Sequence, residues 1–124
     1  MAKKKFEMNI GGVVKDMYFS ATDVVTPAVT VTATGDVTQA LDANKFYVFG
    51  EVDSLTLTLN APTACADGTV PLAMYAGKFT SAASAACTLS LPATVTEGAN
   101  NPTIEAGKTY EFNIADNVLL MVEV

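Results

Sequence analysis

Apolar and polar residues alternate strictly near the C-terminal end of the chain. Tyr110, Phe112 and Ile114 take every second position, and the residues between them, such as Thr109 and Glu111, are polar. A period of two places these two sets on opposite faces of a β-strand. The pattern therefore predicts a strand in which Tyr110 and Phe112 belong to the core, while Thr109 and Glu111 face solvent.

The chain also contains a copy of one of its own segments, because residues 41–59 reappear as residues 104–122 without a gap. The identical pairs are Ala43/Ala106, Lys45/Lys108, Tyr47/Tyr110, Phe49/Phe112, Asp53/Asp116 and Leu57/Leu120. A repeat of this length indicates one supersecondary unit that is used twice. We expect the two copies to superpose as equivalent units.

Turn residues predict that each copy is a β-hairpin. Asn44 and Gly107 occupy equivalent positions in the turn before the first strand, where a positive φ is expected. Later in each copy, a pair of short polar residues, Asp53-Ser54 or Asp116-Asn117, is expected to turn the chain back into a second strand.

Similar signals run through the rest of the chain. They predict further short strands over residues 4–10, 13–19, 29–34, 71–80 and 88–91, and no stretch has the period of an amphipathic helix. Regularly spaced strands with turns between them predict an all-β fold, either an antiparallel β-sandwich or a jelly-roll-like arrangement. At 124 residues, the chain is expected to form a single domain.

Two of the predicted strands are apolar on both faces. In the first strand, Phe46 and Val48 lie on one face, and Tyr47 and Phe49 lie on the other. In the second strand, Leu119 and Met121 lie on one face, and Val118, Leu120 and Val122 lie on the other. One face of each strand serves the core, so the other face needs a cover. A loop or the predicted N-terminal hairpin is one explanation, a subunit interface is another, and the sequence leaves both open. The candidate contact residues are Phe46, Val48, Leu119 and Met121.

Charge is distributed unevenly along the chain. Residues 1–15 carry four lysines against Glu7, a net +3, whereas the remainder carries three lysines against twelve acids, a net −9. An acidic body without arginine binds phosphate poorly, so nucleic acid is not an expected partner. The basic N-terminal arm, residues 1–5, is either a solvated terminus or a docking arm for an acidic protein surface. Its candidate contacts are Lys3, Lys4, Lys5 and Phe6.

The chemistry-bearing residues favour a protein without catalytic activity. The chain has no histidine, which excludes Ser-His-Asp and Cys-His catalytic groups. Glu51 and Asp53 could form the carboxylate pair of a glycosidase, but their predicted place at a strand end is typical of ordinary solvated acids. Cys65 and Cys87 are expected to be small, buried or half-buried thiols rather than a disulfide or a zinc site. We therefore expect no catalytic residue, no metal and no cofactor.

Targeting signals are not evident in the sequence. No run of about 18 apolar residues predicts a membrane span, and the first ten residues lack the apolar stretch of a secretion signal. The expected place of synthesis is therefore the cytoplasm, and a membrane is not an expected partner.

The C-terminal half resembles small β modules of tailed-bacteriophage virion proteins. The resemblance rests on the segment 88–93, TLSLPA, followed by 102–111, PTIEAGKTYE, and a final hydrophobic hairpin. The first copy, residues 46–59, is similar to the opening of such modules, so that the resemblance covers roughly residues 41–124. Modules of this kind occur in fibres, decoration proteins and auxiliary capsid proteins.

The resemblance implies a non-enzymatic virion structural protein, made in the host bacterial cytoplasm and located in the virion. It would be a capsid decoration or auxiliary protein or a head-fibre protein, with other virion proteins as partners, foremost the major capsid protein. It would also form a homo-oligomer, preferably a trimer. The alternative is a module of a phage fibre that binds a host glycan or receptor, for which Tyr75 is the candidate exposed aromatic platform.

Overall fold

The computed structural model describes residues 3–10, 13–20 and 28–124, the first two ranges as backbone strands. In these residues the fold is all-β and contains no helix. The strands are β1 (Lys3–Ile10), β2 (Val13–Ser20), β3 (Ala28–Val31), β4 (Gly35–Leu41), β5 (Phe46–Leu59), β6 (Met74–Ser81), β7 (Thr88–Ser90), β8 (Thr96–Glu97), β9 (Thr109–Ala115) and β10 (Val118–Glu123).

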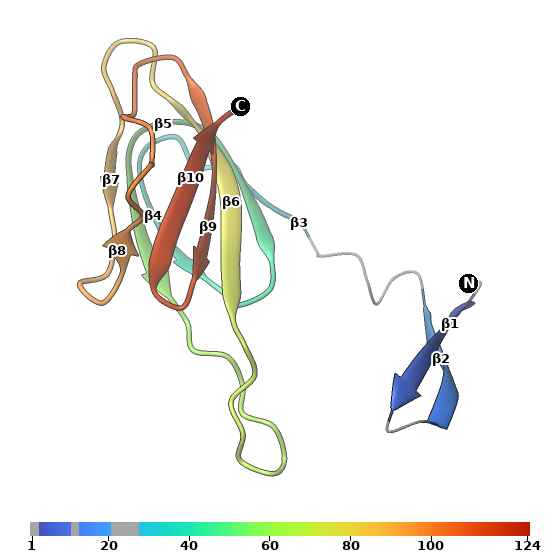
Figure 1. Cartoon of the computed structure of the whole chain (residues 1–124). Helices are drawn as coiled ribbons and strands as arrows, with labels where there is room; N and C mark the ends of the chain where they lie inside the picture. Colours follow the sequence, from blue (N-terminus) through green and yellow to red (C-terminus); the bar gives the residue numbers. More distant parts are fainter. Residues whose placement is uncertain (1–2, 11–12, 21–27) are drawn as a thin grey trace.

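The strands form two sheets. β1 and β2 pair antiparallel in a two-stranded sheet of their own, and the remaining strands form an eight-stranded sheet (Figure 1). Its main path is β3-β5-β6-β9-β10-β8, and β4 and β7 also pair with β5. The sheet is mixed. β3, β4, β6 and β7 all run parallel to β5, and β8 runs parallel to β10, whereas β9 is antiparallel to both β6 and β10. The prediction of an antiparallel arrangement is therefore wrong around β5, because alternation along one strand does not reveal the direction of its neighbours.

Strand β5 has different neighbours along its length. Its first residues pair with β3 and β6, and from Val52 onward it pairs with β4. The register shifts between Val48 and Glu51, and the ribbon of β5 bends over at one end of the body (Figure 1). A bulge of this kind bends a strand and changes which residues face inward. Accordingly, Phe49 and Val52 are both buried although three positions separate them.

The core collects the inward-facing residues of β4, β5, β6, β9 and β10. It includes Val37, Leu41, Tyr47, Phe49, Val52, Leu55, Leu57, Tyr75, Phe79, Tyr110, Phe112, Ile114, Leu119 and Met121. The prediction for β9 is confirmed for Tyr110 and Phe112, which are buried, and for Glu111, which is exposed. Thr109 is half-buried instead, because its hydroxyl shares a hydrogen bond of 2.8 Å with the hydroxyl of Thr80.

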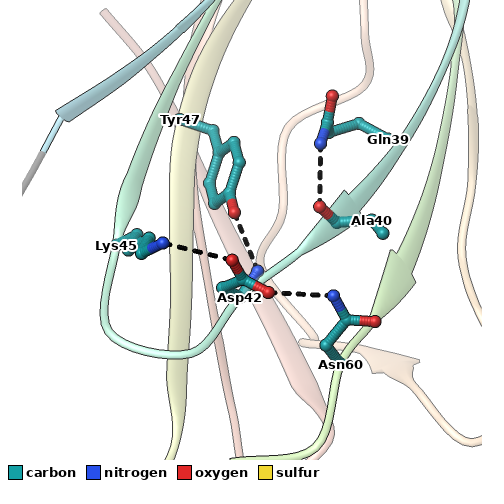
Figure 2. A network of polar contacts seen from close by, with 6 residues as sticks. All are labelled: Gln39, Ala40, Asp42, Lys45, Tyr47 and Asn60. Atoms are coloured by element: carbon teal, nitrogen blue, oxygen red, sulfur yellow. Dashed lines mark hydrogen bonds and ion pairs between the residues drawn. The ribbon is translucent and has the colours of Figure 1, made fainter.

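The turns that open the two repeat copies have the same geometry. In the first, the backbone N–H of Asp42 donates to the hydroxyl of Tyr47 at 2.8 Å (Figure 2). In the second, the N–H of Glu105 donates to the hydroxyl of Tyr110, also at 2.8 Å. The predicted positive φ is present at Asn44 (62°) and Gly107 (75°).

The copies differ after this shared turn. β9 and β10 form the predicted hairpin, closed by Asp116 and Asn117 with φ values of 50° and 59°. The prediction of a hairpin in the first copy is wrong, because β5 continues through Asp53 and Ser54 to Leu59.

Candidate interaction surfaces

One side of the sheet is turned away from the core across β5, β6, β9 and β10. Strand register aligns two rows of residues on it: Phe46, Ala76, Asn113 and Leu120 in one row, and Val48, Lys78, Glu111 and Val122 in the other. We call these eight residues the outer face. Five of them are apolar, so this side of the sheet has the composition of a covered surface.

The outer face is apolar and partly hollow. Leu120 and Val122 are 59% and 60% exposed. Together with Phe46 on β5, Ala76 on β6 and the β9 residues between them, they line an open hollow of about 380 Å³. Exposed apolar residues gathered in this way are typical of surfaces that contact another protein layer.

The structure corrects two of the predicted contact residues. Leu119 and Met121 are core residues, exposed by 0% and 6%, because they pair with Ile114 and Phe112 and share the inward face of the hairpin. Phe46 and Val48 do lie on the outer face and are half-buried. Their contact with a partner stays a prediction.

Sequence reasoning missed the outward residues of β10, although a signal was present. A two-residue turn at Asp116-Asn117 fixes the hairpin register. That register places Leu119 opposite Ile114 and leaves Leu120 and Val122 on the other face.

The predicted docking residues of the N-terminal arm lie within β1 rather than in a free arm. Register pairs Lys3, Lys4 and Lys5 with Ser20, Phe19 and Tyr18, and Phe6 with Met17. The side chains of these residues lie outside the described part of the structure, and residues 1–2 of the predicted arm lie outside it altogether.

A second candidate surface is the loop between β5 and β6, residues 60–73, which projects from the body (Figure 1). Val70 and Leu72 on this loop are 67% and 77% exposed. Its tip is held by backbone hydrogen bonds from the N–H of Cys65 to the oxygen of Thr69 (2.7 Å) and from the N–H of Gly68 to the oxygen of Cys65 (2.9 Å). An ordered loop that exposes large apolar side chains is suited to docking.

A carboxylate stabilises the tip of the 60–73 loop. Asp67 accepts hydrogen bonds from the hydroxyl of Thr69 at 2.6 Å and from its backbone N–H at 3.0 Å. These hydrogen bonds favour the ionised form and lower the pKa of Asp67 below its ordinary value. Because the tip is ordered by its own contacts, less conformational entropy is lost when it binds.

The polar corner around Asp42 is a structural feature at the base of the same loop (Figure 2). The carboxylate of Asp42 accepts hydrogen bonds from Asn60 at 2.9 Å and from Lys45 at 3.1 Å. The bond from Asn60 is the larger cause of the lowered pKa of Asp42, and the positive charge of Lys45 adds to it. These contacts tie the end of β5 to the turn that precedes it.

Glu51 and Asp53 both line one open hollow of about 350 Å³. The carboxylate of Glu51 accepts a hydrogen bond from the backbone N–H of Ala83 at 3.2 Å, so it is engaged in holding the loop after β6. The other residues that line the hollow, Thr34, Gly35 and Ala82, are small and offer no aromatic surface to a sugar ring.

Tyr75 is not an exposed aromatic platform. It is buried, and its hydroxyl donates a hydrogen bond of 2.6 Å to the backbone oxygen of Asn60. The interpretation of Tyr75 as a glycan-binding residue is therefore wrong, because the residue anchors the 60–73 loop to β6.

The two cysteines are separate free thiols, but only Cys87 has the predicted burial. Cys65 is exposed on the 60–73 loop, and Cys87 is buried in the core. Burial raises the pKa of the Cys87 thiol, which keeps it protonated and unreactive.

The described residues lack two further features, a cluster of metal-ligating side chains and a membrane-spanning helix. Within residues 28–124 and the described strands before them, no three His, Cys, Asp or Glu side chains gather as they would around a metal ion. In the same part of the chain, no helix is long and apolar enough to span a membrane.

Comparison with known proteins identified no relative. No protein-family model matches the sequence, and no significant match was found among curated proteins or solved structures.

Proposed function

We propose that this protein is a non-enzymatic structural protein of a tailed-bacteriophage virion, a capsid decoration or auxiliary protein or a head-fibre protein. It would dock on a neighbouring virion protein, foremost the major capsid protein. The support from sequence is the resemblance of residues 41–124 to virion β modules. We also propose that the eight-stranded sheet folds into two sandwich-like layers and that β5 passes from one layer to the other.

The observation that carries the proposal is the 60–73 loop. Val70 and Leu72 are large, strongly exposed apolar side chains that lie two positions apart on one loop, whose tip is held by its own hydrogen bonds. Buried apolar contacts of this kind contribute about 25 cal/mol per Å² removed from water. We infer that the loop inserts into a complementary surface on another protein, and its two exposed apolar side chains support this part of the proposal.

Charge supports the same proposal. Residues 3–20 hold four lysines against Glu7 and Asp16, a net +2, whereas residues 28–124 hold three lysines against ten acids, a net −7. A basic strand at one end of an acidic chain can steer docking on an acidic neighbour and set its orientation. Lys3, Lys4 and Lys5 on β1 are the proposed steering residues.

Binding to particles that lack the protein tests this function. Changing Val70 and Leu72 together to Asp is expected to weaken binding at least about tenfold, because two charges would enter an apolar contact. The matched control is the pair Thr63→Asp and Ala66→Asp, which adds the same charge to exposed positions of the same loop. Equal binding by the two double variants would contradict the proposed role of the loop.

Self-association is a separate part of the proposal. A homo-oligomer, preferably a trimer, is expected from the resemblance. Sedimentation of the isolated protein across a range of concentrations measures it directly.

A further inference from the structure

The outer face leaves an apolar surface without a cover in the described chain. Its apolar members come from three strands, Phe46 and Val48 on β5, Ala76 on β6, and Leu120 and Val122 on β10. Sheets pack face to face at about 10 Å through such residues. A second layer of β structure is therefore the cover that fits the outer face best.

The β1–β2 hairpin has the matching pattern. Its register pairs Phe6 with Met17 and Ile10 with Val13. Since alternate positions of paired strands share a face, one face of the hairpin collects Phe6, Met8, Ile10, Val13, Met17 and Phe19, with Lys4 and Lys15 among them. A two-stranded hairpin is at best marginally stable in water without a partner for its apolar face.

We propose that the β1–β2 hairpin packs its apolar face on the outer face of its own chain. The connection permits this arrangement. The hairpin leads into β3, and Ala28 at the start of β3 pairs with Phe46 at the edge of the outer face. The chain between Ser20 and Ala28 can extend to about 26 Å. The four strand spacings from β3 to β10 amount to about 19 Å, so the hairpin can reach all of the outer face.

Charge and tethering favour this occupant over a second copy of the body. The hairpin carries a net +2 and the body a net −7, so they attract each other, whereas two bodies repel. A short tether also gives the hairpin an effective concentration in the millimolar range. A free second copy at micromolar concentration competes poorly with it.

The arrangement has a consequence for docking. The strand positions of Lys3 and Lys5 belong to the opposite face of the hairpin from Phe6. When the hairpin covers the outer face, these positions lie on the outside of the molecule, where an acidic neighbour can reach them.

Thiol labelling of the full chain tests the inference. In a Cys65→Ser background, a single reporter cysteine is placed on the outer face by Leu120→Cys, and in a second protein by Val122→Cys. A third reporter, Val70→Cys on the 60–73 loop, serves as a reference site. Each reporter is combined with Phe6→Lys and Met17→Lys, which are opposite each other in the register of the hairpin. The matched control is Asn9→Lys with Ser20→Lys, which adds the same charge to the other face.

We expect the outer-face reporters to react at least about tenfold faster in the Phe6→Lys, Met17→Lys protein than in the parent or the Asn9→Lys, Ser20→Lys control. The reference reporter should react at the same rate in all three, and the parent's protection should not change on dilution. Equal outer-face rates in all three proteins would overturn the inference. Protection that disappears on dilution would also overturn it and assign the outer face to a second copy. Because no particle is used, the result is independent of the docking test on the 60–73 loop.

Discussion

The two repeat copies begin alike and end differently. Each opens with a turn in which a backbone N–H, from Asp42 or Glu105, donates to the hydroxyl of the tyrosine five residues later. Each then buries that tyrosine and the phenylalanine two residues beyond it. After this point, the first copy continues as one long strand, and the second turns back into a hairpin.

Two local differences account for the divergence. The first copy has Gly50 and Glu51 where the second has Asn113 and Ile114, so that its inward pattern is interrupted by a bulge. It also has Ser54 where the second copy has Asn117, whose φ is 59°. Asparagine tolerates this left-handed backbone much better than serine does. The residues that the two copies share therefore determine the opening turn, and the residues that differ determine the direction of the chain after it.

The largest expected effect is loss of the shared aromatic pair. Phe112→Ala and its counterpart Phe49→Ala should each destabilise the fold by roughly 3–5 kcal/mol, because both remove a buried ring and leave a cavity. Chemical denaturation measures the free energy of unfolding. Phe46→Ala on the outer face is the control, and an equally large loss there would contradict the assignment of faces.

A smaller loss is expected at the point where the two copies meet. Gly77 is the register neighbour of both Tyr47 and Phe112, and a Cβ there would lie 2.5 Å from the backbone oxygen of Tyr47. Gly77→Ala should cost roughly 1–3 kcal/mol through overpacking. Gly50→Ala, where a Cβ meets nothing within 4 Å, is the matched control. Equal melting temperatures for the two variants would argue against this close approach.

The hairpin turn provides the sharpest test of the divergence. Asn117→Ser should destabilise the protein by roughly 1 kcal/mol, because serine replaces asparagine in left-handed backbone. Asn117→Gly should retain stability, since glycine adopts that conformation freely. If both variants unfold at the same denaturant concentration, backbone conformation is not the reason for the turn.

The hydroxyl groups of Tyr47 and Tyr110 should contribute modestly different amounts to the free energy of unfolding. Tyr47→Phe removes the acceptor for Asp42, whereas Tyr110→Phe removes the acceptor for Glu105 and also a donor to the oxygen of Thr103 at 3.1 Å. At roughly 0.5–1.5 kcal/mol for each hydrogen bond, Tyr110→Phe should be the more destabilising change. The reverse order in denaturation would contradict a stabilising role for the additional bond to Thr103.

The smallest effect concerns acid. The pKa of Asp42 is lowered in the folded protein by its hydrogen bonds to Asn60 and Lys45. Its contribution to stability is therefore present above the ordinary Asp range and is lost as the pH falls through that range toward the folded value. Asp42→Asn should flatten the decline of the urea midpoint between about pH 5 and pH 2. Glu97→Gln controls for the loss of an exposed charge. If the urea midpoint of Asp42→Asn declines with pH as steeply as that of the parent, Asp42 does not contribute to the acid sensitivity.

Local patterns predicted the strands more successfully than their arrangement. Period-two alternation placed Tyr110 and Phe112 in the core, and turn chemistry identified Asn44 and Gly107 as positions of positive φ. Alternation gave no answer for β10, because a strand that is apolar at every position has no marked face. The partner strand decides there, by pairing Leu119 with Ile114.

The parallel pairing around β5 and the exposure of the 60–73 loop depend on contacts between distant segments. Val70 and Leu72 have the composition of a strand, yet both are exposed on a loop whose base is tied to β6 by the hydrogen bond from Tyr75 to Asn60. Such contacts have no local signature in the sequence. The burial of Leu119 also depends on its partner strand. A charge meant for the outer face of β10 therefore belongs at Leu120, because Leu119→Lys would place a charge in the core.

We propose that the protein is a structural component of a virion. A mass-spectrometric inventory of virus particles purified from a culture that produces the protein tests this claim most directly. We expect the chain to be present at a fixed ratio to the major capsid protein in every preparation. Absence of the chain from purified particles, with abundant chain in the cleared lysate, would contradict it.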